Sequence, residues 1–193
     1  MSFLSTRAEF EACLLQFFNE SNACSSEIIK WHWQESQSIL KQTYLKRNTI
    51  VLLNKPTIDY TSFNLNENQL IEEENDPSII DQHMTDNSIQ LEHHIVYSTS
   101  YQVPVLYFKA NYNNGTPLSH AEIYKYIISE VYQHIALSQN EHPILLEPFW
   151  YIHPCDTRTL MKTFEFKSLD YIKVWLSVYG PMVKCSMSTD MFK

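Results

Sequence analysis

Residues 92–112 of this 193-residue chain read EHHIVYSTSYQVPVLYFKANY. β-Branched and aromatic residues fill two runs, Glu92–Ser100 and Val103–Tyr112, and this composition favours β-strands. No helical pattern lies between the runs, so the two strands follow one another directly along the chain. Consecutive strands of this kind predict an antiparallel sheet rather than the alternating strands and helices of a parallel one.

The segments upstream of this pair predict further strands and an N-terminal helix. Trp31–Gln34 alternates as a strand does, and Tyr44–Leu53 ends in apolar residues of high β propensity. Thr6 and Glu9 have the spacing of a capping box, and apolar residues at helical spacing follow them. The sequence therefore predicts a helix over residues 6–23.

The segments downstream of the pair predict helices. A helix is expected to begin at Ser119 and to carry Ile123, with residues 160–164 forming one or two further turns. A closing helix is predicted over residues 168–178 and is expected to end at Gly180. The order of helix, four strands and helices predicts one α+β domain over residues 1–193, an antiparallel four-stranded meander flanked by helices.

The acidity of the chain is concentrated in one segment. The formal net charge is −8, from 22 acidic and 14 basic residues, and nine of the acidic ones lie between residues 56 and 108, where no Lys or Arg occurs. Residues 57–90 are polar and have no sustained period, which predicts a flexible acidic insert within the domain. Such a segment argues against a nucleic-acid partner. With only two glycines, the chain also lacks a glycine-rich phosphate loop.

The distribution of apolar residues and cysteines indicates the compartment. No apolar run approaches the length of a membrane span, and the first ten residues lack the pattern of a secretory signal. The four cysteines at 13, 24, 155 and 185 show no close pairing, which is typical of reduced thiols. The expected location is therefore the cytoplasm, without stable membrane insertion.

One of these cysteines follows a dense aromatic run. The segment Phe149-Trp150-Tyr151-Ile152-His153-Pro154-Cys155-Asp156-Thr157 leads from apolar residues through a rigid His-Pro step to a thiol and then to polar residues. A reactive cysteine needs exposure and a favourable electrostatic setting, which such a position supplies. The alternative is a buried cysteine that packs as a small hydrophobe. Residue chemistry alone leaves both interpretations open.

Several motifs in order resemble those of the autophagy branch of the ubiquitin-conjugating enzymes. They are Tyr-x-Val-Pro-Val-Leu-Tyr-Phe from Tyr101, Glu-His-Pro from Glu141, His-Pro-Cys-Asp-Thr from His153 and Trp-Leu-Ser from Trp175. The resemblance covers roughly residues 93 to 183, with a looser match at residues 31–48. It implies the fold of ubiquitin-conjugating enzymes, in which a helix packs on a four-stranded meander and the cysteine follows the sheet.

The resemblance also implies an activity and partners. Cys155 is expected to accept a ubiquitin-like modifier as a thioester from an activating enzyme and to pass it to a lysine of an acceptor autophagy protein. Recruitment to membranes that form autophagosomes is expected of such an enzyme. Three alternatives stay open: a sibling that transfers its modifier to phosphatidylethanolamine, a cysteine hydrolase, and an inactive binding module of the same fold.

The roles of the neighbouring residues follow less directly. His153 either holds the loop by hydrogen bonding or lowers the pKa of the thiol, and Asp156 either polarises an incoming lysine or caps a helix. The chain lacks the His-Pro-Asn tripeptide whose Asn stabilises the oxyanion in ordinary ubiquitin-conjugating enzymes. The candidates for that role are the amides near Asp156 and Thr157, the Thr157 hydroxyl, and the side chains of Asn140, Tyr97 and Tyr101.

No metal or other cofactor is expected. His93 and His94 are adjacent, and neighbouring residues on a strand point to opposite faces of the sheet, so these two cannot easily share an ion. His83, in the acidic insert, has no partner at a fixed spacing.

Overall fold

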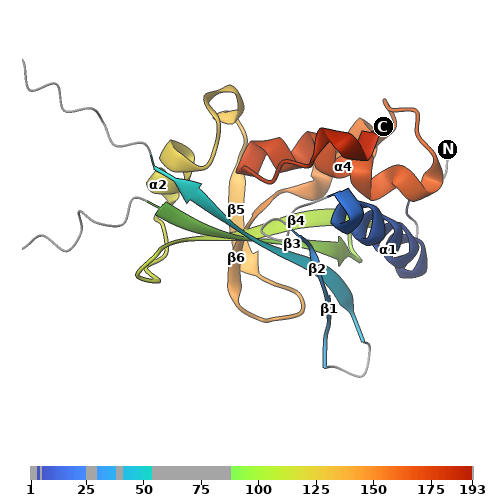
Figure 1. Cartoon of the computed structure of the whole chain (residues 1–193), viewed down its shortest axis with the longest axis horizontal. Coiled ribbons are helices and arrows are strands. Elements are labelled where there is room, and N and C mark those ends of the chain that lie inside the picture. Colours follow the sequence, from blue (N-terminus) through green and yellow to red (C-terminus); the bar gives the residue numbers. More distant parts are fainter. Residues whose placement is uncertain (1–3, 5, 25–29, 38–40, 54–87, 193) are drawn as a thin grey trace, which may run out of the picture.

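An antiparallel sheet of six strands lies at the centre of the computed structural model, which describes residues 4, 6–24, 30–37, 41–53 and 88–192 (Figure 1). Neighbouring strands lie in the order β1-β2-β3-β4-β6-β5, and every pair is antiparallel. The strands are β1 (His32–Glu35), β2 (Thr43–Leu52), β3 (Ser88–Ser98), β4 (Val103–Tyr112), β5 (Leu137–Glu141) and β6 (Pro148–Ile152).

The predicted four-stranded meander is confirmed as β1 to β4, and two further strands that were not predicted extend the sheet to six. The aromatic run before the cysteine is itself a strand, because Phe108 and Tyr107 of β4 pair with Trp150 and Tyr151 of β6. β6 also pairs along its length with β5, which closes a hairpin. These two strands are five residues each and the loop between them carries a proline, so neither has a pattern long enough to recognise in the sequence.

The boundary predicted for the acidic insert also needs a correction. β3 begins at Ser88, so residues 88–90 belong to the sheet and pair with the end of β2, as in Ile89 with Val51. Ser88 and Ile89 are buried, which explains why this stretch is ordered into the strand. The remainder of the predicted insert, residues 57–87 with His83, lies outside the described residues.

Two of the helix starts form as the sequence predicts. Helix α1 spans Arg7–Cys24, and Thr6 and Glu9 exchange the two bonds of a capping box, at 3.0 and 3.2 Å. Helix α2 spans His120–Tyr126, and Ser119 and Glu122 form a second capping box. α2 ends at Tyr126, and the chain then makes a separate 3-10 turn at Glu130–Tyr132.

The C-terminal helices are split more finely than predicted. Helix α3 spans Thr157–Met161, earlier than the turns expected at residues 160–164, and α4 spans Tyr171–Tyr179 after a 3-10 turn at 168–170. α4 continues into a 3-10 turn at Gly180–Val183. Gly180 is needed there for space, because a Cβ atom at this position would lie 2.3 Å from the carbonyl oxygen of Cys185.

The main core lies between the sheet and helices α1 and α4, which contact each other on one face of it (Figure 1). Alternate residues of each strand point into this core, as strand geometry requires. On β3 these are Ile89, Leu91, His93, Ile95 and Tyr97. The large buried side chains that meet them include Phe10 and Phe17 of α1 and Trp175 of α4.

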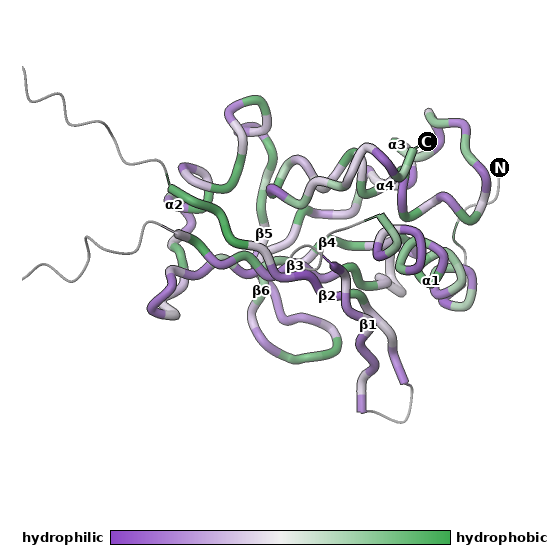
Figure 2. Tube along the Cα trace, in the orientation of Figure 1, coloured by the Kyte–Doolittle hydropathy of each residue, from purple (hydrophilic) through white to green (hydrophobic). Residues whose placement is uncertain are grey.

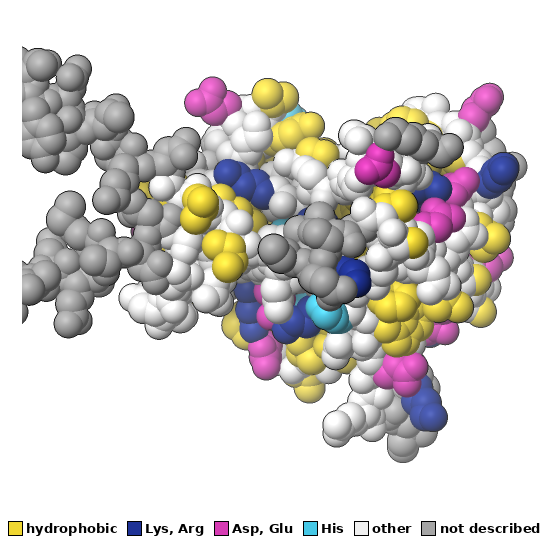
Figure 3. Space-filling view, viewed as in Figure 1, with side chains coloured by type: hydrophobic (Ala, Val, Ile, Leu, Met, Phe, Trp, Pro, Cys, Tyr) yellow, Lys and Arg dark blue, Asp and Glu magenta, His cyan; other side chains and the backbone are white. Residues whose placement is uncertain are grey.

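The surface mixes polar and apolar side chains. On the face drawn in Figure 3, acidic and basic groups are interspersed with hydrophobic ones. The end of β2 is apolar (Figure 2), and Ile50 and Leu52 there are 67% and 78% exposed. Within the described part of the chain, no helix combines the length and apolar character needed to cross a bilayer.

Candidate active site

Cys155 lies in a 3-10 turn, Pro154–Asp156, that follows β6 directly and precedes α3. The ring of Pro154 fixes its backbone angle and is buried, as is Ile152 at the end of β6. Cys155 itself is exposed. The turn therefore presents the thiol to solvent from a firmly anchored backbone, which is the arrangement that cysteine chemistry needs.

His153 caps the turn with its side chain. Its Nδ1 accepts a hydrogen bond from the backbone N–H of Cys155 at 3.2 Å, and its Nε2 lies 3.3 Å from the hydroxyl of Tyr101. Because Nδ1 is an acceptor, the neutral ring carries its proton on Nε2 and donates it to Tyr101. Both ring nitrogens are thus engaged in holding the loop.

A second contact fixes the turn between β3 and β4 to this loop. The guanidinium of Arg158, in α3, donates to the Gln102 side chain at 2.8 Å and to the Tyr101 carbonyl at 3.4 Å. Gln102 has a positive φ of 54°, so its backbone is held in a sparsely populated conformation. The result is that Tyr101 remains beside His153 although the two residues are 52 positions apart.

Thr157 anchors the other end of the turn. Its side chain is 1% exposed, and its hydroxyl donates to the hydroxyl of Tyr179 in α4 at 3.0 Å. Burial raises the pKa of Tyr179, and the nearby Asp156 and Cys155 add to the effect, so the phenol stays protonated. As an acceptor from Thr157, the Tyr179 hydroxyl keeps its own proton to donate elsewhere.

The backbone amides of the turn are already used. The N–H of Cys155 donates to His153, and that of Thr157 donates to the Pro154 carbonyl. In a 3-10 helix each amide bonds to the carbonyl three residues earlier, which directs the Asp156 amide to His153. The amides proposed as oxyanion donors are therefore occupied in this conformation, and the Thr157 hydroxyl is turned into the protein.

Two other candidates, Tyr97 and Asn140, do not line the pocket that contains Cys155, but they line a second pocket of about 270 Å³ together with Tyr101 and with Pro154 of the thiol turn. The ring of Tyr97 packs 5.3 Å from that of Phe10 in α1, with the Arg7 guanidinium over it, and its side chain belongs to the core. Asn140 is exposed on β5, where its side-chain oxygen accepts from the N–H of Glu141 at 2.8 Å. Tyr101 is thus the one tyrosine of the predicted pair that meets His153.

A pocket of about 330 Å³ opens beside Cys155. Its floor and walls come from residues far apart in the sequence: the segment before β5, the thiol turn, α3 and the end of α4. The lining residues are His134, Ile135, Ala136, Ile152, His153, Cys155, Asp156, Leu160, Tyr179 and Met182. Asp156 precedes α3 at the position of its cap, but its side chain makes no capping hydrogen bond.

The other thiols differ from Cys155 in their surroundings. Cys13 and Cys185 are buried, and loss of solvent raises the pKa of each to about 11, so both are protonated at neutral pH. Cys24 is exposed but lies at the last residue of α1. Cys155 is exposed and lines a pocket together with His153 and Asp156.

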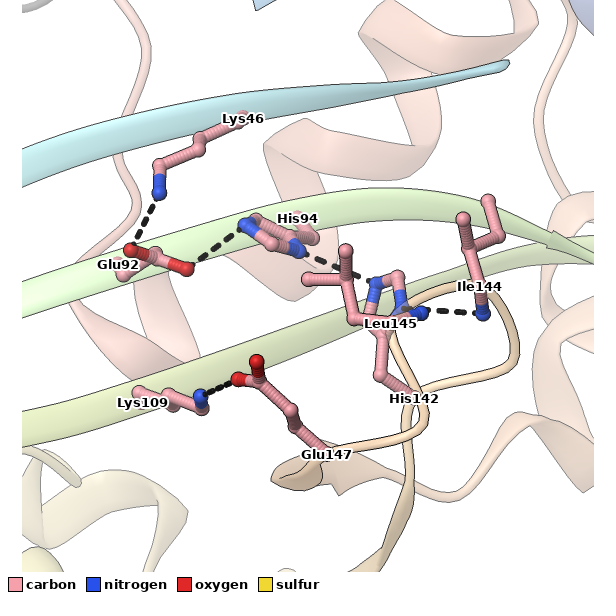
Figure 4. A network of polar contacts seen from close by, with 8 residues as sticks. All are labelled: Lys46, Glu92, His94, Lys109, His142, Ile144, Leu145 and Glu147. Atoms are coloured by element: carbon pink, nitrogen blue, oxygen red, sulfur yellow. Dashed lines mark hydrogen bonds and ion pairs between the residues drawn. The ribbon is translucent and has the colours of Figure 1, made fainter. Parts of the chain in front are cut away.

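A polar network holds the hairpin that delivers the thiol turn (Figure 4). Lys46 lies 2.6 Å from Glu92, Glu92 lies 3.0 Å from His94 Nε2, and His94 Nδ1 lies 3.1 Å from His142 Nε2. His142 Nδ1 then accepts the backbone N–H groups of residues 144 and 145. The network thus ties the loop between β5 and β6 to β2 and β3.

Charge and burial set the protonation of this network. The contact with His94, aided by Lys46, holds the pKa of Glu92 at about 2. Burial lowers the pKa of His94, and it lowers that of His142 to about 3, so both rings are neutral. Neutral rings with their protons on Nε2 satisfy every contact in the series. His94 Nε2 then donates to Glu92, His142 Nε2 donates to His94 Nδ1, and His142 Nδ1 accepts from the two backbone N–H groups.

The prediction that His93 and His94 face opposite sides of the sheet is confirmed. His93 points to the helices, where its Nε2 lies 2.9 Å from the Val183 carbonyl, whereas His94 points to His142. Within residues 4, 6–24, 30–37, 41–53 and 88–192, no group of three or more His, Cys, Asp or Glu side chains is placed to hold a metal ion.

Sequence reasoning missed Tyr179, Arg158 and the segment 134–136. Tyr179 looks like one more apolar position of a closing helix, and residues 134–136 carry no motif. Only the folded chain brings them to the thiol turn. No sequence signal marks Tyr179, whose hydroxyl meets the thiol turn through its hydrogen bond with Thr157, 22 positions away.

Comparison with known proteins places this geometry in a family. The family model described as "Autophagocytosis associated protein, active-site domain" matches residues 9–189. The chain belongs to this family. The match includes the thiol turn, the pocket beside it and all six strands.

Curated members of this family are similar over part of their length. The chain is 39% identical over 121 residues to "Ubiquitin-like-conjugating enzyme ATG10" of Homo sapiens, covering 56% of this chain and 54% of that protein. It is 36% identical over 120 residues to the protein of the same name in Dictyostelium discoideum, covering 51% and 52%. For Arabidopsis thaliana the values are 32% over 135 residues, covering 62% and 60%. The matches thus span little more than half of these relatives.

Solved structures support the fold. The chain resembles "Solution structures of KmAtg10" with a TM-score of 0.51 and 16% identity, covering 96% of this chain and 99% of the other. It resembles "Crystal structure of Autophagic E2, Atg10" with a TM-score of 0.55 and 13% identity, covering 96% and 100%. These similarities confirm the predicted α+β fold.

Proposed function

We propose that this protein is a conjugating enzyme of autophagy that carries a ubiquitin-like modifier on Cys155 and transfers it to a lysine of an acceptor protein. The observation that carries the proposal is the exposed Cys155 on its locked turn, within a chain that belongs to an autophagy active-site family. The three curated relatives share the name of ubiquitin-like-conjugating enzyme, which supports the same activity here.

The first step is the loading of Cys155. The Cys155 thiolate attacks the thioester carbonyl that joins the modifier to the activating enzyme; a new carbon–sulfur bond forms, the old one breaks, and the thiolate of the activating enzyme leaves. In this step His153 and Tyr101 hold the turn, so the sulfur is presented in one position.

The tetrahedral intermediate needs a donor for its oxyanion. The amides of the turn are engaged and the Thr157 hydroxyl is buried. Two hydroxyl groups near the turn keep a proton to donate: that of Tyr179, which lines the thiol pocket, and that of Tyr101, which accepts from His153. We assign the donor role to Tyr179 and a positioning role to Tyr101, because only Tyr179 lines that pocket together with Cys155.

A hydrolase is a less suitable assignment. It requires a histidine that takes the proton of the thiol and is itself oriented by an acid. Here Nδ1 of His153 accepts from a backbone amide and Nε2 contacts a tyrosine, so neither nitrogen faces the thiol as a base. Among the described residues no carboxylate contacts this ring.

Cytoplasmic location, an activating enzyme and a protein acceptor complete the proposal. The acceptor class separates a protein-conjugating enzyme from a lipid-conjugating sibling. In a reconstituted reaction with phosphatidylethanolamine vesicles and the acceptor autophagy protein both present, the modifier is expected on a protein lysine. A lipid adduct in place of the protein adduct would assign the sibling activity.

The loading step is tested with cysteine variants. The wild-type protein is incubated with the autophagy modifier, its activating enzyme and ATP, and the adduct is treated with thiol reductant. We expect a reducible adduct for the wild type and for Cys24→Ser, which changes the other exposed thiol. Cys155→Ser should give an adduct that resists reductant, or none. Reducible loading of Cys155→Ser contradicts the proposal.

A further inference from the structure

The pocket beside Cys155 has walls and a rim of different chemistry. Ile135, Ile152, Leu160 and Met182 give it apolar sides. The one carboxylate in its lining is Asp156, which directly follows the reactive cysteine and is exposed. No Lys or Arg lines it, and its other ionisable groups are His134, His153, Cys155 and Tyr179.

The Asp156 carboxylate is available for a ligand. It occupies the cap position of α3 but makes no hydrogen bond to that helix. The backbone of the residue is held by the 3-10 turn, and Asp156 lines the pocket together with Cys155. A pocket with apolar sides and one anionic group at the reactive end fits a side chain with an alkyl stem and a cationic head.

We propose that this pocket binds the side chain of the acceptor lysine, with Asp156 receiving its ammonium group. The inference rests on the proposed function, because it gives a position to the amine that the loaded enzyme must meet. The alkyl stem of the lysine packs between the segment 134–136 on one side and Leu160 and Met182 on the other. Its nitrogen then lies beside the thioester on Cys155.

The transfer step balances in this arrangement. The lysine ammonium releases one proton to water through Asp156, and the neutral nitrogen attacks the thioester carbonyl. The new carbon–nitrogen bond forms as the carbon–sulfur bond breaks. The nitrogen gives a second proton to the departing Cys155 thiolate, so an amide, a free thiol and one released proton remain. Asp156 lowers the barrier by placing the amine, which is a proximity effect.

The pocket suits the acceptor better than the tail of the modifier. The reacting carbon of the modifier is a neutral carbonyl, and a carboxylate at the reactive end of the pocket offers it no attraction. An ammonium group gains a charge-assisted contact at the same place. If the tail occupied the pocket instead, changes to its walls would slow the loading of Cys155 rather than its discharge.

Single-turnover discharge of the preloaded enzyme tests the proposal. After loading is quenched, free L-lysine or hydroxylamine is added and loss of the thioester is followed. Hydroxylamine is small and largely uncharged at pH 7.5, so it needs neither the apolar walls nor the carboxylate. Asp156→Asn should lower the ratio of lysine to hydroxylamine rates about 10-fold, which corresponds to about 1.4 kcal/mol of lost contact energy.

Two further variants make the test specific. Ala136→Trp fills the pocket from an exposed, irregular segment and should lower the same ratio at least as much. Glu165→Gln removes an equal charge from an exposed position outside the pocket and should leave the ratio within twofold of wild type.

Each outcome bears on the inference. An unchanged ratio in Asp156→Asn and Ala136→Trp, with normal loading, overturns the lysine pocket but leaves the proposed function standing. Slower loading of these variants with unchanged discharge assigns the pocket to the modifier and also overturns it. If the wild type forms no thioester at all, the proposed function fails and the inference falls with it.

Discussion

Acid should destabilise this fold through its buried histidines. His93 and His142 are each 0% exposed, and burial lowers the pKa of each to about 3, against an unfolded value of about 6.5. The unfolded chain therefore binds more protons than the native one between these limits. The free energy of unfolding is therefore highest above about pH 6.5 and decreases as the pH falls below that value.

The magnitude follows from the two pKa values. Between pH 7.5 and pH 5.0, a group whose pKa falls from about 6.5 to about 3 on folding costs about 2 kcal/mol. Two such histidines cost about 4 kcal/mol, and the lowered pKa of His94 acts in the same direction. A typical domain has only about 5–15 kcal/mol of stability, so the loss should be large.

Urea unfolding at the two pH values measures this loss. In His93→Gln and in His142→Gln the loss between pH 7.5 and 5.0 should each be smaller than in wild type by about 2 kcal/mol. His32→Gln changes an exposed histidine on β1 and should leave the loss unchanged. If all four proteins lose the same stability, the buried rings do not set the acid response and the assigned protonation states are wrong.

The remaining predictions concern the thiol turn and its support. Tyr179→Phe should slow loading about 10-fold or more. Thr157→Val removes the same hydrogen bond but leaves the phenol, so it should slow loading much less. Equal losses in the two variants would mean that the Thr157–Tyr179 hydrogen bond has only a structural role. His153→Ala should slow loading by freeing the Cys155 amide, and Tyr101→Phe should do so to a smaller extent, both measured by single-turnover thioester formation with unfolding curves as controls. Gly180→Ala should destabilise the fold by about 2 kcal/mol or more in urea unfolding, because the added Cβ meets the Cys185 carbonyl, while Gly115→Ala meets no atom within 4 Å and is strained only by its φ of 85°.

The sequence predicted those parts of the fold that have long runs of one character. The strands at 44–53, 92–100 and 103–112 have nine or ten residues rich in β-forming types, and the helix at 6–23 has apolar residues at helical spacing behind a capping box. The hairpin of β5 and β6 was not predicted, since five-residue strands next to prolines give little periodic signal and pair only after the chain has folded. The acidic segment hid the start of β3 for a similar reason, as its last three residues continue a polar stretch.

The candidate site divides in the same way. The His-Pro-Cys tripeptide and the aromatic run before it indicated an exposed thiol, and Cys155 is exposed in the structure. The residues that complete the site, Tyr179 and Arg158, act through contacts with residues 22 and 56 or more positions away. No local pattern encodes such contacts. The burial of Thr157 depends on the packing of α4, and that of Tyr97 depends on the packing of α1.

The most direct test of the account is to locate the thioester. The wild-type protein is loaded with modifier, its intact mass is measured, and the adduct is digested under acid conditions that preserve thioesters. We expect one modifier per chain, attached to the peptide that contains Cys155 and lost on addition of thiol reductant. Attachment to a peptide that contains Cys24, or a mass that does not change in the presence of modifier, activating enzyme and ATP, would contradict the account.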